Sequence, residues 1–296
     1  MLSRAKRDAL FASCINALNA VLYSNIWLAA AAGLLTAGTL HHWAPGQPWS
    51  APAAHLPWLV FAATLLVYSL DAALPYKHGQ PAGASARKRW QQRHRGLLLG
   101  LAAGAAAAAL WYFVRDGWWR HPVLLGHLAA LALLYSVPLP LPRQAGPAGR
   151  RALREIPLLK AWLVAYVWAA VTAGLPALAL GRPLAEAWPL LGQRLLLVLA
   201  LVLVFDIRDF SRDQAAGLRT FPALLGVAGT RWLGIGALAL SVGLGLGRGE
   251  NPVALLLPAG CAAAAILGAT ETRHDYYFAL FTDGVLLVRA AAYYFN

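Results

Sequence analysis

The chain has 296 residues, of which 59% are hydrophobic and only 12% are charged, whereas roughly a quarter of the residues of a soluble domain are charged. Apolar runs such as 195–205 and 253–270 exclude a single water-soluble core. In lipid, backbone N–H and C=O groups must be hydrogen-bonded to one another, which leaves helices or closed barrels. The apolar runs of this chain are continuous and do not alternate with polar residues, so they predict helices. The net charge of +13 does not indicate nucleic-acid binding, because the basic residues are spread over several loops between apolar segments.

In chain order, the basic residues Arg4, Lys6 and Arg7 precede an apolar stretch that reaches about Leu40, which is too long for a cleaved signal peptide. We therefore expect a retained first span. Pro and Gly interrupt the apolar runs and separate the spans. The predicted spans are 17–41, 57–74, 97–114, 121–140, 156–180, 187–206, 222–246, 252–270 and 276–293. The predicted fold class is an all-α polytopic membrane bundle of about nine transmembrane helices, with residues 1–296 in a single domain.

The distribution of Lys and Arg predicts the orientation of these helices. With the N-terminus in the cytoplasm, all but six of the 25 Lys and Arg lie in or near cytoplasmic segments, as the positive-inside rule requires. The C-terminus is then outside, and we expect a bacterial inner (plasma) membrane. The six residues on the outer side are Arg115, Arg120, Arg182, Arg194, Arg248 and Arg289.

Two residue types that often form metal or redox sites give no such signal here. Cys14 and Cys261 both lie in apolar runs and provide neither a disulfide framework nor a metal spacing. His41 and His42 fall on the outer side without further ligands nearby, so we interpret them as loop residues.

Three carboxylates stand close together in the segment 206–222, which reads Asp-Ile-Arg-Asp-Phe-Ser-Arg-Asp-Gln-Ala-Ala-Gly-Leu-Arg-Thr-Phe-Pro. Asp206, Asp209 and Asp213 are at i, i+3 and i+7, so they share one face if the sixth span continues through them. Mg²⁺ fits such a group, because it binds one or two carboxylates and completes its shell with water and substrate phosphates. A solvated, ion-paired loop is the alternative. Gly217 is expected to end the helix, and Thr220 to begin the next one.

The order and spacing of this segment resemble the second aspartate-rich motif of the UbiA-type membrane prenyltransferase superfamily, which also has nine helices. The residues at 134–138 (Leu-Tyr-Ser-Val-Pro) and 154–160 (Arg-Glu-Ile-Pro-Leu-Leu-Lys) are similar to the family's segment between helices four and five. The resemblance covers roughly the second to the seventh helix. It implies a Mg²⁺-dependent enzyme that acts on a polyprenyl diphosphate.

The family's first motif, Asn-Asp-x-x-Asp-x-x-x-Asp, is degenerate in this chain. The corresponding segment 68–75 reads Tyr-Ser-Leu-Asp-Ala-Ala-Leu-Pro, with Asp71 as its one carboxylate. The second, fourth and sixth spans run in the same direction, so Asp71, Tyr135 and Asp206 are expected at the same cytoplasmic ends. Asp71 also fits a helix-end residue near the headgroups, and Tyr135 also fits an interface aromatic residue.

Four basic residues near these ends are candidate ligands of a diphosphate: Lys77, Arg154, Lys160 and Arg208. A cluster of positive charge attracts such an anion. The positive-inside rule and attraction to anionic lipids explain the same charges without a ligand.

The leading functional hypothesis is a prenyltransferase that transfers a prenyl group to a lipophilic acceptor, which the resemblance implies is aromatic or another lipid-soluble molecule. The predicted catalytic residues are Asp71, Asp206, Asp209, Asp213 and Tyr135. Asp206, Asp209 and Asp213 are also the predicted Mg²⁺ ligands, and the ion would help the diphosphate to leave. The apolar bundle would shield the allylic cation from water.

Two other hypotheses remain open. A terpene cyclase would use the substrate's own double bond as the nucleophile. The other hypothesis is a protein that is not an enzyme of this kind. It would be a transporter or a non-catalytic membrane protein that keeps a diphosphate pocket. Transporters carry ionisable groups near the bilayer midplane on interrupted helices, and Asp283 is the one acidic residue that we expect in mid-span.

The predicted orientation can be tested with single cysteines in a protein whose Cys14 and Cys261 have been replaced. A membrane-impermeant thiol reagent added to intact cells should label a cysteine placed next to Gly46 and should leave Ser85→Cys unlabelled. Labelling of Ser85→Cys from outside would overturn this topology.

Overall fold

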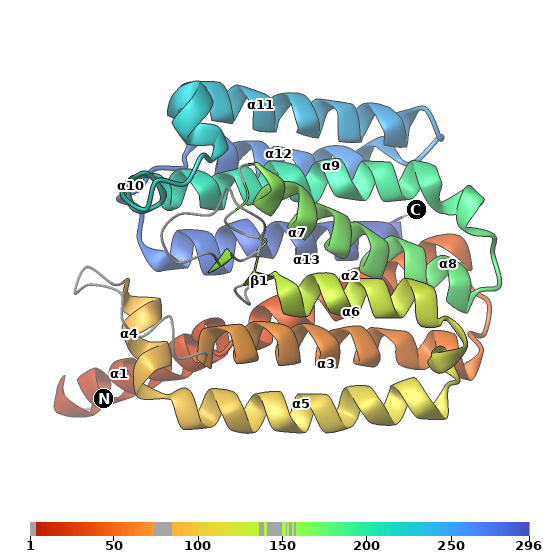
Figure 1. The fold of residues 1–296 in the computed structure, drawn as a ribbon, viewed down its shortest axis with the longest axis horizontal. Helices are drawn as coiled ribbons and strands as arrows, with labels where there is room; N and C mark the ends of the chain where they lie inside the picture. Colours follow the sequence, from red (N-terminus) through yellow and green to blue (C-terminus); the bar gives the residue numbers. More distant parts are fainter. Residues whose placement is uncertain are drawn as a thin grey trace.

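The computed structural model describes residues 4–73, 85–135, 139–140, 150–151, 153, 156 and 158–295. Long helices lie side by side in a bundle, with α1, α4 and α10 gathered at one end (Figure 1). A two-residue antiparallel pair joins β1 (Leu139–Pro140) to β2 (Arg150–Arg151). The α-helices are α1 (Arg4–Tyr23), α2 (Ile26–Trp43), α3 (Ala51–Ala73), α4 (Ala86–Arg93), α5 (Arg95–Arg115), α6 (Pro122–Leu134), α7 (Leu159–Ala169), α8 (Leu175–Ala179), α9 (Leu184–Arg208), α10 (Phe210–Ala215), α11 (Phe221–Leu246), α12 (Pro252–Leu267) and α13 (Asp283–Ala292).

Two of the long helices contain π-helical turns. Ala170–Gly174 joins α7 to α8, and Tyr277–Thr282 leads directly into α13. Short 3₁₀ turns are formed by Trp118–Arg120, before α6, and by Tyr293–Phe295, after α13.

Among the residues that the structure describes, six helices are long and apolar enough to cross a membrane, and the predicted all-helical, multi-pass membrane fold is confirmed. They are Ala51–Ala73, Arg95–Arg115, Leu159–Ala179, Leu184–Arg208, Phe221–Leu246 and Tyr277–Phe295. The bent pair α1 and α2 and the shorter apolar helices α6 and α12 account for the other predicted spans. The exact number of nine spans stays a prediction.

Three sequence predictions about helix boundaries are wrong. The first span, 17–41, is not one helix, because the chain bends by 58° between Tyr23 and Ile26. Asn25 causes the break by taking a left-handed conformation (φ 69°) that ends regular helix geometry. The expected loop 75–96 contains α4, which begins where the Ser85 side chain accepts a hydrogen bond from Lys88 N. The span 121–140 ends early, at Leu134.

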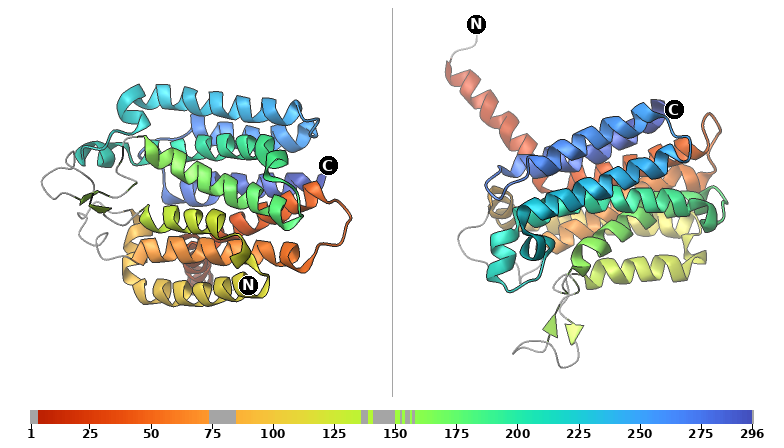
Figure 2. Two further views of the ribbon diagram at one scale, coloured as in Figure 1. Left: turned by 45° about the vertical axis from the view of Figure 1, so that its right-hand side comes forward. Right: turned by 90° about the horizontal axis from the view of Figure 1, so that it is seen from above.

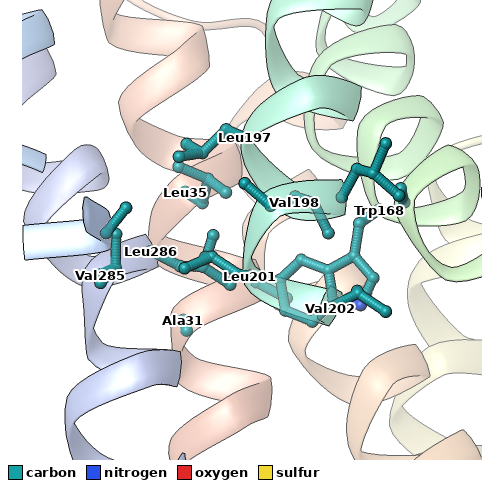
Figure 3. Close-up of a cluster of buried hydrophobic side chains, with 14 of the residues drawn as sticks. Ala31, Leu35, Trp168, Leu197, Val198, Leu201, Val202, Val285 and Leu286 are labelled. Carbon is teal, nitrogen blue, oxygen red and sulfur yellow. The ribbon is translucent and has the colours of Figure 1, made fainter. Parts of the chain in front are cut away.

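Helix α9 is the centre of the bundle, since 72% of the residues in its apolar stretch are buried, compared with 17% of those in α5. Leu197, Val198 and Leu201 of α9 pack with side chains of α2, α7 and α13, including Leu35, Trp168 and Leu286 (Figure 3). Exposed apolar side chains cover the outer helices, for example Trp111 on α5 and Trp232 on α11. A bundle that is apolar on both its inner and outer surfaces is suited to lipid.

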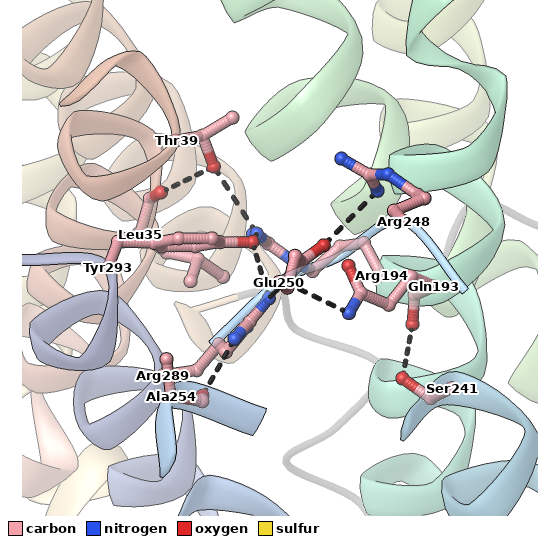
Figure 4. Close-up of polar contacts among 10 residues, drawn as sticks. All are labelled: Leu35, Thr39, Gln193, Arg194, Ser241, Arg248, Glu250, Ala254, Arg289 and Tyr293. Carbon is pink, nitrogen blue, oxygen red and sulfur yellow. Dashed lines mark hydrogen bonds and ion pairs between the residues drawn. The ribbon is translucent and has the colours of Figure 1, made fainter. Parts of the chain in front are cut away.

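A buried polar network lies near the end of the bundle where the C-terminus is found (Figures 1 and 4). Arg194 of α9 is 1% exposed. Its guanidinium donates hydrogen bonds to the hydroxyls of Thr172 (2.9 Å), Thr39 (3.2 Å) and Tyr293 (2.8 Å). These bonds connect α9 to α2, to the first π-helical turn and to the end of α13.

Glu250, in the loop between α11 and α12, completes this network. Its carboxylate contacts Arg289 (2.7 Å) and Arg248 (3.3 Å), and Arg289 also donates to the Ala254 carbonyl. Burial by itself would raise the pKa of Glu250, but the two guanidiniums hold it below its usual value. The glutamate is therefore an ionised partner of two arginines, one of which, Arg289, is fully buried.

Replacing Glu250 by Gln removes this negative charge and keeps the size of the side chain. We expect the free energy of unfolding to fall by about 3–5 kcal/mol, as when a buried ion pair loses one partner. Glu186→Gln is the matched control, because Glu186 and Arg182 form an exposed pair at 3.2 Å, and such pairs contribute about 0–1 kcal/mol. Denaturant titration in detergent micelles measures both changes.

The lowered pKa of Glu250 adds a pH signature to this comparison. A carboxylate whose pKa is lower in the folded state than in the unfolded state stabilises the protein at pH values above its ordinary pKa of about 4.5. This stabilisation is lost as the pH falls through the lower, folded-state pKa. The difference between the wild type and Glu250→Gln should therefore shrink in acid. Equal stability of the two proteins at neutral pH would refute this role of the network.

Candidate functional site

The aspartate-rich segment lies at the end of the bundle that α4 and α10 occupy (Figure 1). Asp206 and Arg208 are in the last turn of α9, Asp209 stands between the two helices, and Asp213 is in α10. The three carboxylates would share one helical face only if the sixth span continued through them, and this condition is not met. Helix α9 ends at Arg208, and the chain begins a new short helix after Asp209.

The predicted helix boundaries after this segment are confirmed. Gly217 adopts φ 69° and donates its N–H to Gln214 O (3.0 Å), while Leu218 N donates to Asp213 O (2.9 Å). This is the glycine-dependent pattern that satisfies the last carbonyls of a helix. Thr220 is the N-cap residue of α11, with Pro222 in its first turn.

Lys160, in the first turn of α7, joins two of the three carboxylates. Its Nζ lies 2.8 Å from Asp206 Oδ1 and 3.4 Å from Asp213 Oδ2. The two aspartate side chains are 2% and 8% exposed, so their charges are largely removed from water. The lysine is brought there by a backbone hydrogen bond from Leu158 N to Arg219 O (3.2 Å), which ties the start of α7 to the loop before α11.

The carboxylate of Asp209 is bound by two arginines. Its carboxylate accepts two hydrogen bonds from Arg208 (3.0 and 3.1 Å) and forms an ion pair with Arg212 (2.8 Å). Burial by itself would raise the pKa of Asp209, but these guanidiniums hold it far below its usual range. Arg208 also lies over the rings of Phe205 and Phe278 at 5.0 and 5.2 Å.

The structure brings Tyr135 and Asp71 to the same region. Tyr135, at the C-terminal end of α6, lies within electrostatic range of Lys160, Asp71 and Asp206. Asp71 of α3 is one turn from Tyr68, whose hydroxyl accepts a hydrogen bond from Trp168 Nε1 (3.1 Å). The predicted convergence of the second, fourth and sixth spans is therefore observed for their described residues.

A second group of charges at this end was not predicted as part of the site. Arg87 of α4 donates to Asn25 Oδ1 (2.7 Å), and its backbone N–H donates to Asp275 Oδ2 (2.9 Å). Asp283 is 8% exposed and lies within electrostatic range of Arg87 and Arg208. From the sequence, Arg87 is one of the Lys and Arg residues assigned to the cytoplasmic side, and Asp283 is the acidic residue expected in mid-span.

Two predicted diphosphate ligands, Lys77 and Arg154, lie outside the described residues. The other two, Lys160 and Arg208, are at the site, where each is already in contact with a carboxylate.

The described residues contain no group of three His, Cys, Asp or Glu side chains placed to hold a metal ion. Asp206 and Asp213 nevertheless converge on one point, which Lys160 Nζ occupies. Asp206 Oδ1 is buried beside Lys160 Nζ, and a carboxylate oxygen can accept more than one contact, so it retains accepting capacity. Two oxygen ligands from carboxylates fit Mg²⁺, which takes its remaining ligands from water and phosphate. Asp209 would have to leave its arginine partners to join them.

Solved structures with a similar arrangement of helices support this architecture. The apo structure of a UbiA homolog from Aeropyrum pernix K1 matches with a TM-score of 0.54 at 18% sequence identity, over 90% of this chain and 96% of that chain. A structure from a study of digeranylgeranylglyceryl phosphate synthase in membranes matches with a TM-score of 0.51 at 12% identity, over 93% and 96% of the two chains. No protein family matches the sequence, and no curated protein matches it.

The chain is thus a helical multi-pass membrane protein with a polar cluster at one end of an apolar bundle. Its fold is the UbiA fold, and the predicted fold class is confirmed. At these identities the likeness establishes the fold, while the activity has to be argued from the site.

Proposed function

We propose that the protein is a membrane prenyltransferase of the UbiA type, comprising one domain over residues 1–296. It would transfer a prenyl group from a polyprenyl diphosphate to a lipophilic, aromatic acceptor. The observation that carries this proposal is the convergence of Asp206 and Asp213 on Lys160 at the polar end of an apolar bundle. A diphosphate headgroup needs cations, and its isoprenoid tail needs an apolar environment. This end of the bundle offers both together.

The metal ion in this proposal is Mg²⁺, held by Asp206 and Asp213, with Asp209 as the third ligand once it separates from Arg208 and Arg212. Bound there, Mg²⁺ would neutralise charge that develops on the departing diphosphate. Lys160 must then move its ammonium from the carboxylates to a phosphate oxygen. An unbranched side chain with four methylene groups can make this change without a movement of the backbone.

The remaining cations would bind the diphosphate directly. Arg208 already has a fixed orientation, because Asp209 accepts from two of its nitrogens. If Asp209 turns to a metal, the freed guanidinium fork can bind two phosphate oxygens. Lys77 and Arg154 are proposed as further ligands on the evidence of their sequence positions.

The aromatic residues beside the charged cluster would serve the carbon chemistry. Tyr68 and Trp168 are held together by a hydrogen bond, and Tyr135 interacts electrostatically with Lys160 and Asp206. Aromatic faces attract a cation, including the allylic cation formed when diphosphate departs. The surrounding apolar side chains would exclude water, which would otherwise capture that cation.

Asp71 is the one carboxylate at the position of the degenerate first motif. We propose that it contributes to a weaker second metal site, with Lys160 and the other basic residues neutralising part of the diphosphate charge. Turnover should then saturate at low Mg²⁺ concentration.

A binding or transport protein with the same fold is the second candidate. The observation that favours it is Asp283, which is buried at the start of α13 immediately after the π-helical turn Tyr277–Thr282. Buried acids at interrupted helices are common in transporters. The cluster of acidic and basic residues at one end of the bundle favours the enzyme.

The enzyme hypothesis is tested by diphosphate release from farnesyl and geranylgeranyl diphosphate with Mg²⁺ and a panel of aromatic acceptors. We expect Asp213→Asn and Lys160→Met to lower turnover by about 100-fold or more, as when a group that stabilises transition-state charge is lost. Asp71→Asn should lower the rate without abolishing it. Glu186→Gln, which changes an exposed carboxylate in a different ion pair, should leave the rate unchanged.

The outcomes separate the candidate functions. Diphosphate release with a prenylated acceptor supports the transferase, and release without an adduct indicates a cyclase or hydrolytic reaction. Binding without release from any chain length would reject catalysis and leave the binding or transport protein.

A further inference from the structure

The N-terminal helix α1 leaves the bundle (Figure 2, right). It exposes large apolar side chains. Phe11 is 69% exposed and Leu10 is 58% exposed. Ile15, Leu18 and Val21, further along the helix, are exposed by 36–41%. Such an accumulation of exposed apolar residues marks an interaction surface.

These side chains lie on one face of α1. Successive helical residues are separated by about 100°, so the positions 10, 11, 14, 15, 18 and 21 fall within an arc of about 140°. Ser13, Asn16 and Asn19 lie on the opposite arc. Native Cys14, which is exposed, belongs to the apolar arc. The helix is therefore amphipathic along the segment that follows its basic first turns.

The direction of α1 is fixed where it meets the bundle. The helix makes an angle of 58° with α2, so the two cannot form one straight span. Tyr276 donates a hydrogen bond from its hydroxyl to Asn19 Oδ1 (2.6 Å), and Gln91 donates to Tyr23 O (2.9 Å). The ring of Tyr23 also contacts Trp90 of α4 at a centroid distance of 6.2 Å. The C-terminal end of α1 is thus held by α4 and by the segment before α13.

We propose that α1 binds the lipid–water interface, with its apolar arc in the boundary between acyl chains and headgroups. If α2 crosses the bilayer along its normal, Leu10–Tyr23 rises about 20 Å along α1 but only about 10 Å along that normal. The hydrocarbon core of a bilayer is about 30 Å thick, and each headgroup zone adds about 5–7 Å. The apolar segment of α1 therefore stays near one interface instead of crossing the core.

Charge supports a lipid surface as the occupant. Lys6 and Arg7 precede the apolar segment, at the end of α1 that is farthest from the bundle, where they meet the headgroups. Basic residues beside an apolar face are typical of helices that lie in the interface and bind anionic lipids. The surface is on the same side of the membrane as the candidate site, since α1 and α4 are at the same end of the bundle (Figure 1).

The test measures the depth of two positions on opposite faces of α1. One variant keeps Cys14 and carries Cys261→Ala, and the matched variant carries Cys14→Ser, Asn16→Cys and Cys261→Ala. Positions 14 and 16 are about 200° apart around the helix but only about 3 Å apart along it. Each full-length protein is labelled with a bimane fluorophore and reconstituted in vesicles of phosphatidylcholine and phosphatidylglycerol that contain 5-doxyl phosphatidylcholine.

We expect the doxyl lipid to quench the Cys14 label at least about twofold more than the label at position 16, because only the apolar face reaches the acyl chains. Absence of quenching at both positions would place α1 in water and overturn the proposal. Equal, strong quenching at both would also overturn it, since α1 would then be surrounded by lipid as a transmembrane helix. Cross-linking of Cys14 between two chains, without quenching, would show that a second copy covers the face.

Discussion

The ammonium of Lys160 holds together the polar end of this bundle, because two buried carboxylates depend on it for compensation. It lies 2.8 Å from Asp206 and 3.4 Å from Asp213, and so joins α7, α9 and α10. In a low-dielectric environment a carboxylate without a cation is unfavourable, and removing one partner of such a group is more damaging than removing an exposed ion pair. The same requirement for compensation makes this end responsive to any ligand that brings cations or phosphate.

Helix α9 links this cluster to the polar network at the opposite end. Arg194 and Asp206 are on the same helix, about 18 Å apart at 1.5 Å per residue, and the residues between them form the apolar core. The Arg194 network fixes one end of α9 against α2 and α13. The position of Asp206 relative to the other helices is therefore determined partly by contacts far from the site. Strong polar contacts at both ends and apolar packing between them suit a protein whose middle lies in lipid.

The helices could be predicted from the sequence because long apolar runs in lipid leave the backbone few alternatives to a helix. The predicted spans 222–246 and 187–206 agree closely with α11 and α9. The break between α1 and α2 could not be predicted, since it depends on a left-handed Asn25 whose side chain accepts a hydrogen bond from Arg87 of α4. Apolar composition continues through the break and gives no sign of it.

The site could be predicted only in part. The spacing of the three aspartates indicated where charge gathers, and the direction of the spans indicated that Tyr135 and Asp71 lie nearby. The spacing could not show that α9 ends at Arg208 or that Asp209 turns to Arg208 and Arg212. The sequence could not single out Arg87 among its basic neighbours, because its position depends on the fold of α4 against Asn25 and Asp275. Cations close in sequence to a motif are visible in the sequence, whereas cations brought by tertiary packing are not.

The most direct test is a structure of the protein with Mn²⁺ and an unreactive prenyl thiodiphosphate, in which anomalous scattering locates the ion. The proposed function predicts an ion between Asp206 and Asp213, with Lys160 Nζ moved from the two carboxylates to a phosphate oxygen. A substrate analogue bound elsewhere, with Lys160 still in contact with both aspartates, would contradict the account.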